Sequence, residues 1–89
     1  MREAFVCINA TPDSVDTVFG ELKACKEVKE AFRVYGVFDI IARVSGESIE
    51  DLSKIIDTRI KSIDKVQKTL SMLLIELDDF AWKSEPLTV

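Results

Sequence analysis

The chain has 89 residues, a hydrophobic content of 47% and a net charge of −4 from 12 basic and 16 acidic residues. This length predicts a single domain with a small core. The absence of histidine excludes a nucleophilic site with a histidine base, and the acidic balance argues against direct binding of nucleic acid. No apolar segment is long enough to span a membrane, so we expect a cytoplasmic protein with no membrane partner.

The first half of the chain predicts a strand, a helix and a β-hairpin. Residues 4–8 are a continuous apolar run, typical of a buried strand. A helix follows the turn residues around Pro12, with apolar side chains at helical spacing: Val15, Val18, Phe19 and Leu22. Residues 28–35 and 37–44 alternate in polarity on either side of Gly36, which predicts a hairpin. The first hairpin strand is expected to carry Val28, Glu30, Phe32 and Val34 on one face.

The second half predicts a helix, a long strand and a tail. Ser48 is the expected N-cap of the helix, with acidic residues following it. The apolar stripe of this helix comprises Ile49, Leu52, Ile56, Ile60 and Ile63. Residues 66–77 are the last predicted strand, so residues 1–79 are assigned to the domain. Residues 80–89 are expected to be a C-terminal tail or an edge strand.

This order of elements predicts a ferredoxin-like βαββαβ fold of the α+β class. Right-handed crossovers would give a four-stranded antiparallel sheet with both helices on one face. The other face would then expose Val37, Ile41 and Leu73. Because a face this apolar must meet a partner, we expect a homodimer of two sheets, a dimeric α+β barrel.

Several kinds of catalytic or metal site are not indicated. The two cysteines, Cys7 and Cys25, are expected to remain reduced and are too few for a zinc site. The three glycines are too far apart for a phosphate-binding loop. The acidic pairs at 50–51 and 78–79 are typical of a helix start and a strand end. We therefore expect no enzyme, no metal and no cofactor.

The segment around Gly36 is the candidate binding site. Gly36 permits a turn with positive φ, and Asp39 places a carboxylate in an otherwise apolar strand. One interpretation is structural: Asp39 accepts hydrogen bonds from the turn. The other is functional: Asp39 binds the ammonium of a zwitterion, whose carboxylate meets free backbone amides.

The sequence Tyr35-Gly36-Val37-Phe38-Asp39 resembles the hallmark of the RAM domain, the effector-binding domain of Lrp/AsnC regulators. The similarity extends over about residues 3–77 and includes two hydroxyl residues in the last strand, Thr69 and Ser71. It implies dimers of face-to-face sheets, assembled into rings, with small amino-acid effectors between them. The residues implied in binding are Tyr35, Gly36 and Asp39, with Thr69 and Ser71 from a neighbouring chain and Gln67 as a weaker candidate.

The chain begins directly before its first strand, whereas regulators of this family carry a helix-turn-helix there. It therefore resembles the stand-alone RAM proteins, and we expect no direct DNA binding. The leading hypothesis is a sensing module that binds an amino-acid-like effector between subunits and co-assembles with full-length regulators. The alternatives are a purely structural oligomerisation domain and, less favoured, a small dimeric α+β barrel enzyme.

Overall fold

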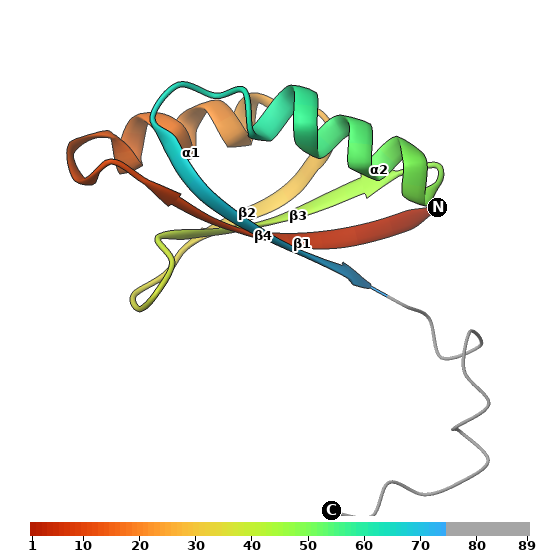
Figure 1. Cartoon of the computed structure of the whole chain (residues 1–89), viewed down its shortest axis with the longest axis horizontal. Coiled ribbons are helices and arrows are strands. Elements are labelled where there is room, and N and C mark those ends of the chain that lie inside the picture. The colour runs from red at the N-terminus through yellow and green to blue at the C-terminus, as the bar shows by residue number, and fades with distance from the viewer. Residues whose placement is uncertain (75–89) are drawn as a thin grey trace, which may run out of the picture.

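The computed structural model describes residues 1–74 and has the predicted ferredoxin-like α+β fold. Its elements are β1 (Arg2–Ala10), α1 (Val15–Ala24), β2 (Val28–Arg33), β3 (Ile40–Gly46), α2 (Ile49–Ile55) and β4 (Val66–Leu74). A 3₁₀ turn (Pro12–Ser14) precedes α1, and a π-helical turn (Ile56–Ile60) extends α2. The antiparallel sheet has the order β2-β3-β1-β4, and both helices cover the same face (Figure 1). The end of the last predicted strand and the tail at 80–89 lie outside the described residues.

The core lies between this face of the sheet and the two helices. Its fully buried side chains are Val6, Ile8, Val18, Leu22, Ile40, Val44 and Ile60. Burying each of them contributes about 1.5–3 kcal/mol. The helix propensity of α1 is weakened by two valines and Gly20, so burial of Val18 and Leu22 is what holds this helix in place.

β2 departs from the predicted alternation by one residue. Val28 pairs with Val44, but Glu30 already pairs with the adjacent residue of β3, so Lys29 is the extra residue of a β-bulge. Val28 therefore faces the core, while Phe32 lies on the opposite face and is 47% exposed. The prediction that Val28 and Phe32 share a face is wrong, because one inserted residue reverses the facing of those that follow.

The face of the sheet that the helices leave uncovered also differs from the prediction. Ile41 lies on it, as predicted, opposite Cys7 of β1. Leu73 pairs with Ala4 and lies on the helix-covered face, so its predicted position is wrong. Val37 does not belong to a strand but to the connection between β2 and β3. Both errors arise because the register of one strand against the next is set by turns and bulges, not by the pattern within a strand.

α2 begins at the cap that the sequence predicts. The backbone amide of Asp51 donates a hydrogen bond to Oγ of Ser48 at 3.0 Å. Oδ2 of Asp51 accepts a second hydrogen bond, from the backbone amide of Glu47, also at 3.0 Å. Ile49 is exposed because it is the first residue of the helix. The buried positions of the predicted stripe are Leu52, Ile56 and Ile60.

Ser48→Ala is expected to lower the free energy of unfolding by about 1 kcal/mol, because the amide of Asp51 loses its acceptor. Urea unfolding followed by circular dichroism measures this difference. Ser53→Ala in the same helix is the matched control, since Ser53 is exposed and should change stability little. Equal stabilities of the two variants would show that the cap is energetically unimportant.

Candidate functional site

The connection between β2 and β3, residues 34–39, projects from the sheet on the side away from the helices (Figure 1). The amide of Val34 donates to the carbonyl oxygen of Asp39 at 2.9 Å and closes the base of this loop. Gly36 has a φ of 154°, which residues with a side chain rarely adopt. A Cβ atom at Gly36 would meet nothing within 4 Å, so it is the backbone conformation that favours glycine here.

Asp39 is fixed to β1 through its backbone and its side chain. Its amide donates to the carbonyl oxygen of Ile8 at 3.0 Å, and its Oδ2 accepts from the amide of Ala10 at 3.1 Å. The carboxylate therefore does have a structural role, but the donor belongs to β1 and not to the turn. Within residues 1–74, Oδ1 has no hydrogen-bond donor, so one oxygen of a half-buried carboxylate is available to a ligand.

Two large side chains of the same loop face solvent. Tyr35 is fully exposed and Val37 is 85% exposed. Apolar side chains on a projecting loop are typical of surfaces that contact a partner or a ligand. The loop thus combines exposed backbone, a carboxylate that β1 holds in place, and two exposed apolar side chains.

The hydroxyl residues of β4 lie elsewhere in the same sheet. Thr69 pairs with Ile8 and Ser71 with Val6, so both side chains lie on the helix-covered face. Ile8 also pairs with Ile40, which places Thr69 about 10 Å from the start of β3, two strand spacings away. A single chain therefore does not bring these hydroxyls to the Gly36 turn.

Gln67 marks an irregularity in β4. Lys68 pairs with Asn9, whereas Val66 pairs with Ala10, so Gln67 is the extra residue of a second β-bulge. Its side chain is exposed near the end of β1 that holds Asp39. The fold therefore brings Gln67 to this end of the sheet but does not join it to the turn.

Ser71 lines a groove of about 300 Å³ between β4 and α2. The apolar lining includes Leu52, Ile56 and Leu73. At its rim Lys61 forms an ion pair with Asp57, with 3.4 Å between Nζ and Oδ1. This groove was not among the sites predicted from the sequence. An Asp and a Lys four residues apart beside the apolar stripe of a helix could have indicated this rim from the sequence. The face of β4 on which Leu73 lies could not have been predicted in that way.

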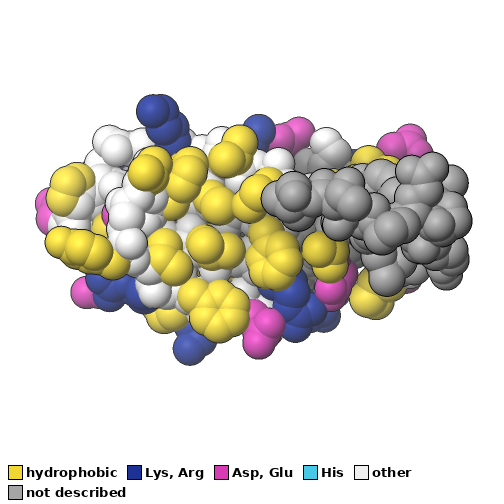
Figure 2. Space-filling view, turned by 90° about the horizontal axis from the view of Figure 1, so that it is seen from below, with side chains coloured by type: hydrophobic (Ala, Val, Ile, Leu, Met, Phe, Trp, Pro, Cys, Tyr) yellow, Lys and Arg dark blue, Asp and Glu magenta, His cyan; other side chains and the backbone are white. Residues whose placement is uncertain are grey.

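The uncovered face of the sheet carries an apolar row that crosses all four strands. The row consists of Phe32, Ile41, Cys7 and Leu70, each paired with the next. Figure 2 shows apolar side chains gathered over this face. On β4, Leu70, Met72 and Leu74 point to the uncovered face, whereas Thr69, Ser71 and Leu73 point toward the helices. The most apolar side of this edge strand is thus the one that the helices leave uncovered.

A polar corner adjoins the apolar row and consists of Glu3, Glu30, Arg43 and Ser45. Arg43 binds both carboxylates, with 2.5 Å from Nη1 to Glu3 and 2.8 Å from Nε to Glu30. Oγ of Ser45 donates to Glu3 at 3.0 Å. The hydrogen bond that Arg43 donates to Glu30 is the main cause that raises the pKa of Arg43, and partial desolvation opposes it. Arg43 therefore stays charged, and the corner keeps an excess of one negative charge when both carboxylates are ionised.

The described part of the chain offers little for other classes of site. Among residues 1–74, no helix is long and apolar enough to cross a membrane. The same residues contain no group of three or more cysteine, aspartate or glutamate side chains placed to hold a metal ion. Cys7 is buried, Cys25 is half-buried, and both are free thiols.

The four-stranded antiparallel sheet with both helices on one face places the chain in the class of small ferredoxin-like α+β domains. Residues 3–77 match the family model described as the Lrp/AsnC ligand binding domain. The chain belongs to this family, so the resemblance predicted from the sequence is confirmed, whereas the binding roles of Gly36 and Asp39 stay predictions.

Solved structures agree with this assignment. The crystal structure of FFRP-DM1 is 33% identical with a TM-score of 0.81, over 84% of this chain and 100% of that one. Hypothetical protein PHS023 from Pyrococcus horikoshii is 33% identical with a TM-score of 0.79, over 85% and 92% of the two chains. A feast or famine regulatory protein from M. tuberculosis, complexed with L-methionine, is 25% identical with a TM-score of 0.74, over 85% and 51%. No curated protein sequence gives a significant match.

Proposed function

We propose that this chain is a self-assembling sensor that binds a small amino-acid effector between subunits. The observation that carries the proposal is the carboxylate of Asp39, held by the amide of Ala10 through one oxygen while the other is free beside the Gly36 turn. The family is a ligand-binding one, and the mycobacterial relative holds L-methionine. We propose a regulatory, non-catalytic role on the same grounds.

The chemistry of a zwitterion fits the separate parts of the site. Its ammonium would donate to Asp39, and its carboxylate would accept from exposed backbone amides at Gly36 and from the hydroxyls of Thr69 or Ser71. The groove lined by Leu52 and Leu73 would take an aliphatic side chain. Because one chain holds these parts apart, the proposed site combines the turn of one subunit with β4 of another.

Assembly is proposed to begin with two sheets packed through the apolar row, which gives the dimeric α+β barrel. The outward-facing side of β4 supports this, since Leu70 and Met72 are 50% and 47% exposed in the single chain. The polar corner would form the rim of such an interface. We further propose that dimers associate into larger assemblies and that the same surfaces bind full-length Lrp/AsnC regulators. We also propose that the protein acts in the cytoplasm and does not contact DNA.

One observation favours the alternative of a purely structural oligomerisation module. The hydrogen bond from Ala10 gives Asp39 a role in the fold that requires no ligand. On this view the carboxylate joins the β2–β3 loop to the end of β1, and its free oxygen meets only water. The two hypotheses differ in whether any amino acid binds.

A thermal-shift screen with each free amino acid, beginning with L-methionine, tests the proposal. A ligand at ten times its Kd stabilises the protein by about 1.4 kcal/mol, which raises Tm by about 5–10 °C for a domain of this size. Light scattering on the same samples gives the mass of the assembly. If none of the amino acids raises Tm while the mass exceeds that of a 10.0 kDa monomer, the structural alternative is correct.

A further inference from the structure

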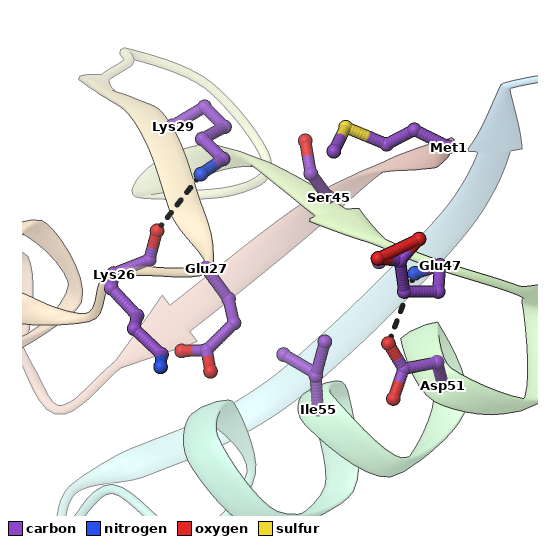
Figure 3. Close-up of a pocket in the computed structure, with 9 residues that line it drawn as sticks. Met1, Lys26, Glu27, Lys29, Ser45, Glu47, Asp51 and Ile55 are labelled. Carbon is purple, nitrogen blue, oxygen red and sulfur yellow. Dashed lines mark hydrogen bonds between the residues drawn. The ribbon is translucent and has the colours of Figure 1, made fainter.

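A second cavity lies at the opposite end of the β2–β3 hairpin from the Gly36 turn (Figure 3). It has a volume of about 390 Å³ and is bounded by the turn before β2, the end of β3 and the first turns of α2. β2 has six residues, so about 20 Å of strand separates the cavity from the Gly36 turn. The cavity is therefore independent of the effector site proposed above.

Glu27 supplies the cavity with a carboxylate that forms an ion pair with Arg59 but has one oxygen without a hydrogen-bond donor. Its side chain is 17% exposed, and its carbonyl oxygen accepts from the amide of Ser45 at 3.0 Å, which fixes the backbone. Oε1 is buried and has no hydrogen-bond donor among residues 1–74. The guanidinium of Arg59 stands 3.9 Å from the other oxygen, beyond hydrogen-bond distance. A buried carboxylate oxygen without a donor is rare, because leaving it unpaired is unfavourable.

Two other charged side chains that line the cavity, those of Lys29 and Asp51, have hydrogen-bond partners in the fold. Nζ of Lys29 donates to the carbonyl oxygen of Lys26 at 3.2 Å. Oδ2 of Asp51 accepts from the amide of Glu47. Figure 3 shows these pairs around the space between the strands and α2. Among the carboxylates that line the cavity, Glu27 is the one with a buried oxygen still in need of a donor.

The apolar wall of the cavity comes from α2, whose Ile55 lies beside Glu27 in the lining. Gly46 allows α2 to approach the end of β3 closely. A Cβ atom there would lie 3.2 Å from Cγ of Leu52 and 3.3 Å from Oδ2 of Asp51. The cavity thus presents a carboxylate and an aliphatic surface on a well-packed part of the fold.

We propose that this cavity binds a small organic cation, a primary amine or a guanidine on a short carbon stem. The cationic head donates to the carboxylate of Glu27, and the stem packs against Ile55. A hard metal ion fits less well, because such ions require several oxygen ligands and residues 1–74 hold no metal-binding cluster.

Titration calorimetry of the whole chain with agmatine at low salt tests this proposal. The parent protein should bind one agmatine per chain saturably. Glu27→Gln should weaken binding about ten- to a hundredfold, because it removes a charge-assisted hydrogen bond while keeping the shape. Arg59→Gln should strengthen binding by about two- to fivefold, because Arg59 competes for the same carboxylate.

Glu21→Gln is the matched control, since Glu21 is exposed on α1 and outside the cavity. It should bind agmatine as the parent does. The proposal is overturned if the parent shows no saturable binding, or if Glu27→Gln binds as tightly as Glu21→Gln. It is also overturned if Arg59→Gln and Glu27→Gln both merely lower Tm without changing agmatine affinity, since Glu27 and Arg59 would then form a structural pair.

Discussion

Ile41→Asp is expected to convert the proposed assembly into monomers at micromolar concentration. Ile41 lies in the middle of the apolar row, between Phe32 of β2 and Cys7 of β1. In a face-to-face dimer the new carboxylate would be buried without a partner, which costs about 3 kcal/mol or more per copy. Both copies carry the change, so we expect the dissociation constant to rise at least about ten-thousandfold.

Analytical ultracentrifugation measures this effect, and far-ultraviolet circular dichroism establishes that the variant is folded. Ile41 is only partly buried in the single chain, so the monomer should tolerate the substitution. Ile49→Asp is the matched control: it makes the same change at an exposed position at the start of α2, away from the uncovered face. A dimeric, folded Ile41→Asp variant would place the interface elsewhere, and a monomeric parent would refute the dimer itself.

The order and type of the elements could be predicted from the sequence because each has a local signal. Alternation marks the hairpin strands, helical spacing marks α1, and Ser48 marks the start of α2. The fold then follows from few assumptions, since right-handed crossovers leave only a few arrangements for this order of elements. These signals come from residues within one turn or one strand of each other.

The facing of side chains could not be predicted wherever a bulge intervenes. Lys29 and Gln67 are extra residues in β2 and β4, and both are polar residues of a kind that also occurs at regular strand positions. A pattern within β4 shows two alternating sets of residues but does not say which set faces the helices. Leu73 was therefore placed on the wrong face, although its alternation with Met72 was evident.

In the candidate site, too, the feature with a local sequence signal could be predicted, and the contact between distant residues could not. The sequence identified Gly36 as a residue needed for backbone conformation, and its φ of 154° confirms this. The partner of Asp39 could not be predicted, because Ala10 lies 29 residues away in the chain and contributes only a backbone amide. Backbone donors carry no sequence signal, so the held carboxylate is visible only in the folded chain.

Asp39→Asn is expected to weaken binding of the effector about ten- to a hundredfold. The ammonium of an amino acid would lose a charge-assisted hydrogen bond, which contributes roughly 1.5–3 kcal/mol. The side-chain oxygen of the substituted asparagine could still accept from the amide of Ala10, so the loop should keep its position. The free energy of unfolding should fall by no more than about 1 kcal/mol, because a neutral acceptor replaces a charged one.

Titration calorimetry with L-methionine, or with the amino acid that gives the largest thermal shift, compares this variant with the parent. Glu21→Gln is the control for the loss of one negative charge, because Glu21 lies exposed on α1 and should leave the affinity unchanged. Equal affinities of the parent and Asp39→Asn would remove Asp39 from the site even if an effector binds. If the parent binds no amino acid and Asp39→Asn only lowers Tm, the carboxylate serves to join the β2–β3 loop to β1. In that case the chain is an assembly module, because the hydrogen bond from Ala10 is then the whole role of Asp39.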